Sequence, residues 1–149
     1  FYLMDKYNMN SDEANSYFNK KSGMLGLSGV SNDLRDVLEA ASSGNQRAQL
    51  ALNVYYTRVK SYIGSYMALL NGCDCLVFTA GVGENGIEVR ENICANLDGL
   101  GIKLDPAKNK VRGKEVDVAT EDSKVRIFVV PTNEELVIAR DTYRLAQSK

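Results

Sequence analysis

The 149 residues include no histidine and no tryptophan. Without histidine, the chain cannot build a Ser-His-Asp triad, a Cys-His pair or a histidine-containing zinc site from its own side chains. Any general base must then be a carboxylate, lysine, tyrosine or cysteine, or must come from elsewhere. The missing histidine therefore excludes several kinds of catalytic and metal centre from these residues.

Cysteine and long apolar runs are also scarce. The three cysteines are Cys73, Cys75 and Cys94. A C-x-C pair in a strand is a poor zinc site without a second cluster, so we expect reduced thiols in a cytoplasmic protein. No apolar run approaches the roughly 20 residues of a membrane span. We therefore expect no membrane partner.

Neither sign of charge is in excess, because 18 Lys and Arg residues face 19 Asp and Glu residues for a net charge of −1. Such a chain has no excess of positive charge to attract nucleic acids or anionic membranes, so we expect neither as a partner. Hydrophobic residues make up 44% and charged residues 25% of the sequence, which is typical of a globular protein. The length corresponds to about one domain.

The first half of the sequence predicts helices. We expect a short helix from Ser11 to about Lys20, a glycine-containing loop over residues 23–29, and a helix capped by Ser31 that stops at residues 42–44. A long helix then runs to about residue 71. Its apolar positions, expected in a core or subunit contact, are Ala48, Leu52, Tyr55, Val59, Tyr62, Tyr66 and Leu69.

The second half alternates between strands and helices. Residues 75–79 predict a strand buried on both faces, residues 81–86 a turn, and the following residues a helix to about residue 97, begun by a capping box of Asn85 and Glu88. Further strands are expected at residues 101–104, 116–119 and 125–130, and a last helix over residues 133–145. This order predicts an α/β fold with helices packed on a mixed, mostly parallel sheet.

One glycine-rich motif follows the first predicted strand. Residues 81–86, Gly-Val-Gly-Glu-Asn-Gly, fit G-x-G-x-x-G before a helix, and Asp105 lies where a ribose-binding acid could be. Glycines allow close approach of a ligand to the backbone, and free N–H groups at a helix start attract phosphate. The alternative is a tight strand-to-helix turn without a ligand.

Two further motifs lie at predicted helix starts. In residues 131–135, Thr132 and Glu135 have capping-box spacing, which leaves Glu134 as a Mg²⁺ ligand or as a solvated residue of the helix start. Asp33 and Arg35 follow a glycine-containing segment at the start of another helix. Taken alone, that pair indicates no more than a helix start with a solvated arginine.

Together these segments closely resemble the acetate and propionate kinase family. The segments that carry the resemblance are residues 20–23, 28–36, 78–85, 89–90, 100–105, 131–136 and 138–142. The resemblance covers essentially all 149 residues, in order and without a large gap. Each motif alone is weak, but their combination displaces the dinucleotide-binding interpretation.

The resemblance implies two actin-like (ribonuclease H-like) ATPase domains with nucleotide bound between them. It implies reversible transfer of the γ-phosphoryl group of ATP to acetate, giving acetyl phosphate and ADP, in a homodimer. It assigns Glu134 to Mg²⁺. It assigns nucleotide binding to Asp33, Leu34, Arg35, Gly81, Val82, Gly83, Glu84 and Asn85.

The same resemblance extends over only the C-terminal part of the family's enzymes. It implies that residues 1–149 form a partial domain on the nucleotide side, with no catalytic residue in this segment and the acetate pocket elsewhere. We therefore expect the isolated segment to be inactive. The alternatives are part of a propionate or butyrate kinase, or a nucleotide-binding and dimerisation module without catalysis of its own.

Overall fold

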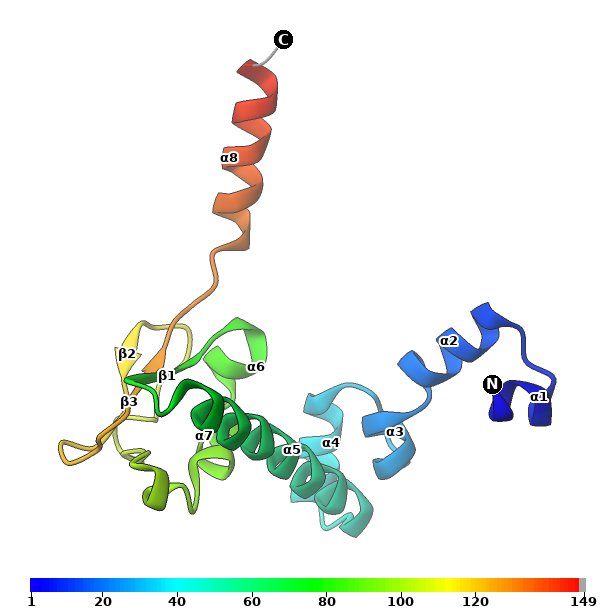
Figure 1. The fold of residues 1–149 in the computed structure, drawn as a ribbon, viewed down its shortest axis with the longest axis horizontal. Helices are drawn as coiled ribbons and strands as arrows, with labels where there is room; N and C mark the ends of the chain where they lie inside the picture. The colour runs from blue at the N-terminus through cyan, green and yellow to red at the C-terminus, as the bar shows by residue number, and fades with distance from the viewer. Residues whose placement is uncertain (148–149) are drawn as a thin grey trace. The chain divides into compact units, whose positions relative to one another are not determined.

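The computed structural model describes residues 1–147, and Figure 1 shows the order of its elements. The chain divides into two compact units, Phe1–Tyr62 and Ile63–Lys149. The helices are α1 (Tyr2–Tyr7), α2 (Ser11–Lys20), α3 (Gly23–Ser28), α4 (Leu34–Ser42), α5 (Gln46–Leu70), α6 (Ala80–Asn85), α7 (Ile87–Cys94) and α8 (Glu134–Gln147), with a 3₁₀ turn η1 (Asp98–Leu100). The strands are β1 (Cys75–Phe78), β2 (Val116–Asp117) and β3 (Arg126–Val129).

Helix α2 confirms the predicted helix from Ser11 to Lys20, but the loop expected over residues 23–29 is wrong. A full capping box begins α2, because Asn10 and Glu13 each accept a hydrogen bond from the other's backbone N–H at 2.9 Å. Residues 23–28 form helix α3. Two of its three nearby glycines lie at its ends, Gly23 with φ 56° and Gly29 with φ 68°, and so delimit the helix.

The N-cap of helix α4 is Asp33, two residues after the expected Ser31. Oδ1 of Asp33 accepts the N–H of Arg35 at 2.9 Å. Ser31 instead accepts the N–H of Asp33 through its Oγ at 3.0 Å, in the turn before the helix. The helix ends at Ser42, as predicted.

The long helix α5 ends at Leu70, as predicted, but only the first part of its apolar stripe is buried. Ala48 and Leu52 are buried, whereas Tyr62, Tyr66 and Leu69 are 48%, 59% and 78% exposed. The stripe therefore contributes to a core near the beginning of the helix. Towards its end it forms an apolar surface.

The second unit is built on a three-stranded mixed sheet with the order β1-β3-β2. Strands β1 and β3 are parallel, with Cys75 opposite Arg126 and Phe78 opposite Val129, and β2 pairs antiparallel with β3. This confirms the α/β class. Residues 101–104 contribute isolated bridges, Ile102 to Val125 and Leu104 to Ala119, in place of the full strand that was expected.

Strand β1 is less buried than its apolar sequence predicts. Phe78 is buried, but Cys75 is exposed and Val77 is 47% exposed. The strand is paired on one side only among residues 1–147, so the expectation of burial on both faces is wrong for this structure. The core of the unit lies mainly around β3, where Ile127 and Val129 are fully buried.

The segment after β1 is helical where a turn was expected. Residues 80–85 form α6, entered through Ala80 at φ 58°, and Gly86 separates it from α7. The expected capping box of Asn85 and Glu88 does not form, because the Asn85 side chain donates to the carbonyl of Gly81 at 3.1 Å. Helix α7 ends at Cys94, before the expected residue 97. No helix within residues 1–147 is long and apolar enough to cross a membrane.

Candidate functional site

The candidate site of the second unit lies where strands β1 and β3 end. Because these strands are parallel, their carboxyl ends meet at one edge of the sheet, and the ladder continues with the N–H of Val130 donating to the carbonyl of Phe78 at 2.9 Å. Helix α6 follows β1, and α8 follows β3. Residues 81–85 and Glu134 therefore start from neighbouring strand ends, which is where ligands bind in many α/β folds.

Thr132 joins these two strand ends through its side chain. Its Oγ1 lies 2.8 Å from Oγ1 of Thr79 and accepts the backbone N–H of Ala80 at 3.1 Å. The hydroxyl therefore holds the end of β1 and the start of α6 against the segment before α8. Sequence reasoning gave this threonine a capping role and missed the junction, because no local pattern relates residues 53 positions apart.

Glu84 makes the closest link between the two motifs. Its Oε1 accepts the backbone N–H of Thr132 at 2.6 Å. A carboxylate bound to a backbone N–H is among the stronger hydrogen bonds of proteins. One hydrogen bond thus ties the glycine-rich segment to the residues that lead into α8.

The capping box expected for α8 is wrong. Asn133 is the residue whose Oδ1 accepts the N–H of Leu136 at 2.9 Å, while Thr132 is engaged with β1 and α6. Helix α8 begins at Glu134, so this residue is the first of the helix. Glu134 and Glu135 are both exposed in its first turn, where carboxylates suit the helix dipole.

The three glycines of the G-x-G-x-x-G motif differ in how much space a side chain would have at each position. A Cβ at Gly83 would lie 3.0 Å from the carbonyl carbon of Phe78, and one at Gly86 would lie 2.5 Å from the carbonyl oxygen of Val82. Packing within the chain therefore excludes a Cβ at Gly86 unless the backbone shifts, and disfavours one at Gly83. Of the three, Gly81 alone has open space where its Cβ would be, so packing within the chain does not require a glycine there.

Arg90 lies behind the glycine-rich segment and is fully buried. Its Nη1 donates to the carbonyls of Gly83 and Glu84 at 2.7 and 3.0 Å, and its Nε donates to Oδ1 of Asn109 at 2.6 Å. Burial lowers the pKa of this guanidinium from its ordinary value. Sequence reasoning gave Arg90 no role. The available signal was an arginine among buried positions of one short helix, next to Val89 and one turn before Ile93 and Cys94.

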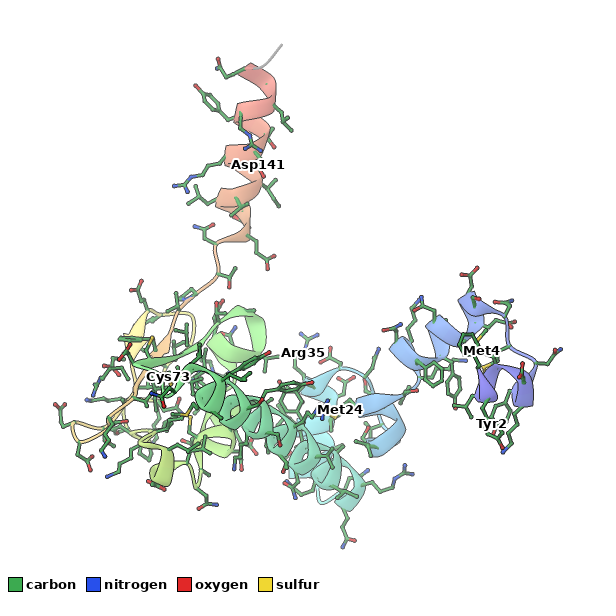
Figure 2. The ribbon with its side chains drawn as sticks, in the orientation of Figure 1. Tyr2, Met4, Met24, Arg35, Cys73 and Asp141 are labelled. Carbon is green, nitrogen blue, oxygen red and sulfur yellow. The ribbon has the colours of Figure 1, made fainter. Side chains whose placement is uncertain are left out.

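The remaining candidates, Asp33, Leu34 and Arg35, belong to the first unit. Nη2 of Arg35 donates to Oδ2 of Asp33 at 2.6 Å, and its Nε donates to Oδ1 at 3.1 Å. The hydrogen bonds from Arg35 lower the pKa of Asp33 to about 2. Figure 2 shows Arg35 at the start of α4, where its side chain is 87% exposed.

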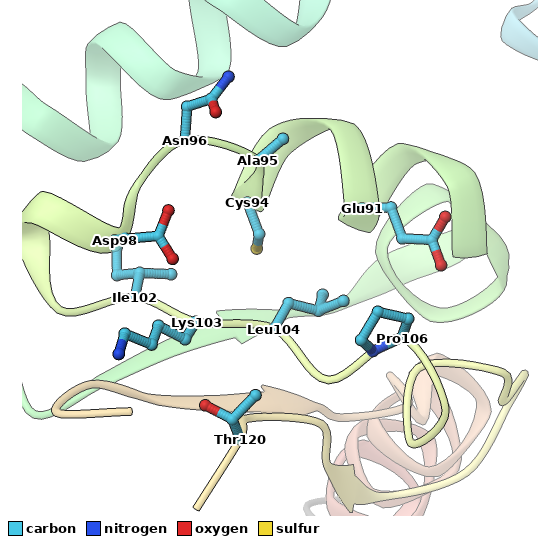
Figure 3. Close-up of a pocket in the computed structure, with 10 residues that line it drawn as sticks. All are labelled: Glu91, Cys94, Ala95, Asn96, Asp98, Ile102, Lys103, Leu104, Pro106 and Thr120. Atoms are coloured by element: carbon cyan, nitrogen blue, oxygen red, sulfur yellow. The ribbon is translucent and has the colours of Figure 1, made fainter. Parts of the chain in front are cut away.

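A separate pocket of about 470 Å³ lies between the end of α7 and residues 102–106. Figure 3 shows Glu91 and Cys94 on one wall and Lys103, Leu104 and Pro106 on the other. None of the candidate nucleotide or metal residues lines it. The candidate site is therefore the junction at the strand ends and not this pocket.

The donor set at the junction fits a magnesium ion that is shared with a ligand. No group of three metal-ligating side chains occurs in the part of the chain that the structure describes. Mg²⁺ is commonly held by one or two carboxylates together with phosphate oxygens and water. Glu134, an exposed carboxylate next to the Thr132 junction, fits that mode of binding.

Comparison with known proteins gives one consistent result. The acetokinase family profile matches residues 1–140. An acetate kinase of Syntrophomonas wolfei subsp. wolfei is 78% identical over 147 residues, which are 99% of this chain and 37% of that protein. The chain thus spans about 37% of the length of this curated relative.

Solved structures agree with this result. The crystal structure of Porphyromonas gingivalis acetate kinase matches with a TM-score of 0.86 and 44% identity, over 97% of this chain and 37% of that one. The propionate kinase of Francisella tularensis subsp. tularensis matches with a TM-score of 0.81 and 39% identity, over 93% and 35% of the two chains. From the profile match and the similarity in sequence and fold, we conclude that the chain belongs to the acetokinase family.

Proposed function

We propose that residues 1–149 are the C-terminal, nucleotide-side region of an acetate kinase, which transfers the γ-phosphoryl group of ATP reversibly to acetate. The observation that carries the proposal is the hydrogen bond from Thr132 N–H to Glu84, at 2.6 Å. It joins the glycine-rich segment to the start of α8, the two motifs that the resemblance assigns to nucleotide and metal. Relatives that are named acetate kinase support the same reaction.

For the nucleotide, we assign one group of residues in each unit. In the second unit the residues are Gly81, Val82, Gly83, Glu84 and Asn85, of which Gly81 has open space at its Cβ position. In the first unit they are Asp33, Leu34 and Arg35. The exposed guanidinium of Arg35, oriented by its hydrogen bonds to both carboxylate oxygens of Asp33, presents a flat cation that suits a nucleotide.

For the metal, we assign Glu134 as the carboxylate that this region contributes to Mg²⁺. The ion, when bound, supplies positive charge that offsets the charge of the phosphate oxygens. The role of this chain is then to hold Glu134 next to the nucleotide segment, through Thr132 and Glu84.

The acyl acceptor and the transition-state cations belong, under this proposal, to the remainder of a longer protein. We place that protein in the cytoplasm as a homodimer. A propionate kinase is the second candidate, because the Francisella tularensis propionate kinase is similar to this chain in fold and sequence. The motifs of this region concern the nucleotide, so they do not select the length of the acyl chain.

The test is a transfer assay with the full-length protein that contains these residues. Acyl phosphate is trapped as the hydroxamate with acetate, propionate or butyrate as acceptor, at saturating ATP and Mg²⁺. We expect acetate to give the largest kcat/KM. Preference for propionate would favour the second candidate, and no acyl phosphate from any acceptor would refute the proposed reaction.

A further inference from the structure

Arg90 uses every N–H of its guanidinium group inside the protein. Besides the bonds to Gly83, Glu84 and the Asn109 side chain, its Nη2 donates to the carbonyls of Asn109 and Val111, both at 2.9 Å. These are five hydrogen bonds to five acceptors, which is the full capacity of an arginine. The side chain therefore has a single defined position.

All five acceptors are uncharged oxygens. The nearby carboxylate of Glu91 accepts a hydrogen bond from Nδ2 of Asn109, at 3.3 Å, and none of the five Arg90 bonds goes to it. A buried cation without a bonded carboxylate is costly to desolvate, and an apolar side chain at the same place would avoid that cost. A functional reason for this arrangement would be that Arg90 holds the carbonyl groups of Gly83 and Glu84 in place.

Those carbonyls belong to the end of α6. A short helix leaves its last carbonyls without helical partners. The carbonyl of Val82 accepts the N–H of Gly86 at 2.9 Å, and the next two, of Gly83 and Glu84, accept from Arg90. Arg90 thus supplies the hydrogen-bond donors that a further turn of helix α6 would have provided, and it orients the backbone of the glycine-rich segment.

We propose that Arg90, held by Asn109, is a positioning residue for this segment: it fixes the carbonyls of Gly83 and Glu84, and thereby keeps the Glu84 side chain on the N–H of Thr132. The inference rests on the proposed nucleotide role of residues 81–85. The connected bonds run from Asn109 through Arg90 and Glu84 to Thr132, two residues before Glu134. Arg90 acts on the reaction only through these residues.

The test compares Arg90→Lys with Arg126→Lys in the full-length enzyme. Lysine keeps the charge at residue 90 but cannot make the five-bond pattern. Arg126 is the matched control, because its guanidinium is also held by several hydrogen bonds, three in all, and these go to Asp117 and Thr120 and not to residues 81–85. Both variants are assayed well below their melting temperatures.

For Arg90→Lys we expect the KM for ATP to rise about tenfold, which corresponds to about 1.4 kcal/mol. The KM for the acyl acceptor should stay within about twofold, since the acceptor does not bind this segment. Arg126→Lys should lower the melting temperature with both KM values unchanged. If Arg90→Lys also changes only the melting temperature, Arg90 is a structural residue and the proposal is wrong.

A milder variant keeps the test decisive if Arg90→Lys does not fold. Asn109→Ala removes one acceptor from Arg90 and leaves the guanidinium in place. Amide hydrogen exchange of residues 80–86 and 131–133 should become several-fold faster in this variant and stay unchanged in Arg126→Lys. Unchanged exchange in Asn109→Ala would overturn the proposal.

Failure of the proposed function remains distinguishable from failure of this inference. Calorimetric titration with Mg²⁺ and ADP measures nucleotide affinity without any transfer reaction. If the wild-type protein binds ADP but forms no acyl phosphate, the proposed reaction fails. The roughly tenfold weaker ADP affinity expected for Arg90→Lys would still support Arg90 as a positioning residue, and an equal affinity would refute it.

Discussion

Glu134 and Glu135 are adjacent exposed carboxylates in the first turn of α8, and only the first is assigned to Mg²⁺. Helix capping cannot distinguish them, because Asn133 supplies the cap. Under the proposed metal role, any difference between them must come from function. This makes the pair a sharp test of the metal assignment at the scale of single residues.

We expect Glu134→Ala in the full-length enzyme to lower turnover by about 10²-fold or more. The substitution removes a proposed ligand of Mg²⁺, the ion whose positive charge offsets the charge of the phosphate oxygens. Glu135→Ala is the matched control and should keep nearly normal turnover. The measurement is turnover against Mg²⁺ concentration, with melting temperature recorded for both. Near-normal turnover of Glu134→Ala at all Mg²⁺ concentrations would show that it is no metal ligand.

At the scale of elements, the Thr132 hydroxyl is the side-chain link between the ends of β1 and β3. Thr132→Val removes the bonds to Thr79 and Ala80 at almost constant shape, whereas Thr132→Ser keeps them. We expect the valine variant to be less stable by about 1 kcal/mol, and the serine variant to regain most of that loss. Denaturant unfolding measures both, and equal stability of the two variants would show that the hydroxyl contributes nothing.

The pairing of β2 with β3 carries an ion pair that depends on pH. Burial raises the pKa of Asp117, but hydrogen bonds from Ala119 N–H and Arg126 outweigh it, so the pKa lies below its ordinary value of 3.8. A lowered carboxyl pKa adds stability that is complete above about pH 4 and is lost as pH falls through the folded-state pKa.

We therefore expect Asp117→Asn to melt at a lower temperature than the parent at pH 7, with a difference that shrinks as the pH falls below about 4. Thermal melts of both proteins between pH 7 and pH 2.5 measure this. Glu121→Gln is a suitable control, because its ion pair with Lys108 is 93% exposed on the carboxylate side. A difference that is independent of pH would contradict the role given to the Asp117 charge.

At the scale of the whole molecule, the chain spans about 37% of the length of the Syntrophomonas wolfei relative. We expect the 149-residue chain, purified alone, to make no acetyl phosphate, because the proposed cations and acceptor pocket are elsewhere. Loss of such cations costs phosphoryl transfer on the order of 10³–10⁵ in rate. Acetate-dependent ADP formation above that residual level would overturn the assignment of catalysis to other residues.

We also expect the chain to self-associate. Large apolar side chains are exposed on the last turns of α5, at Leu69 and Leu70, and on α8, at Val137 and Ile138. Exposed apolar side chains that cluster on one helix are typical of protein contacts. Sedimentation that finds only monomer at about 100 μM, well above common weak-interface affinities, would contradict this expectation.

Local chemistry explains why parts of the fold could be predicted from the sequence. The bounds of α2, the end of α5, the strands β1 and β3, and the α/β class follow from apolar spacing and from turn residues that act on their neighbours. Two of the wrong predictions are local as well. Glycines at the ends of α3 predict a loop at residues 23–29, and the glycines of residues 81–86 predict a turn where a six-residue helix forms at 80–85. The exposure of β1 and of the end of α5 depends instead on what packs against them.

The sequence by itself determined the family, the absence of histidine chemistry and the identity of the candidate segments. Only the tertiary structure decided what Glu84, Thr132 and Arg90 do. The hydrogen bond between Glu84 and Thr132 joins residues 48 positions apart. The hydrogen bonds of Arg90 satisfy the donors of a fully buried side chain. The Glu84–Thr132 bond depends on the parallel pairing of β1 with β3, which brings the two strand ends together, and no periodicity along the chain encodes that meeting.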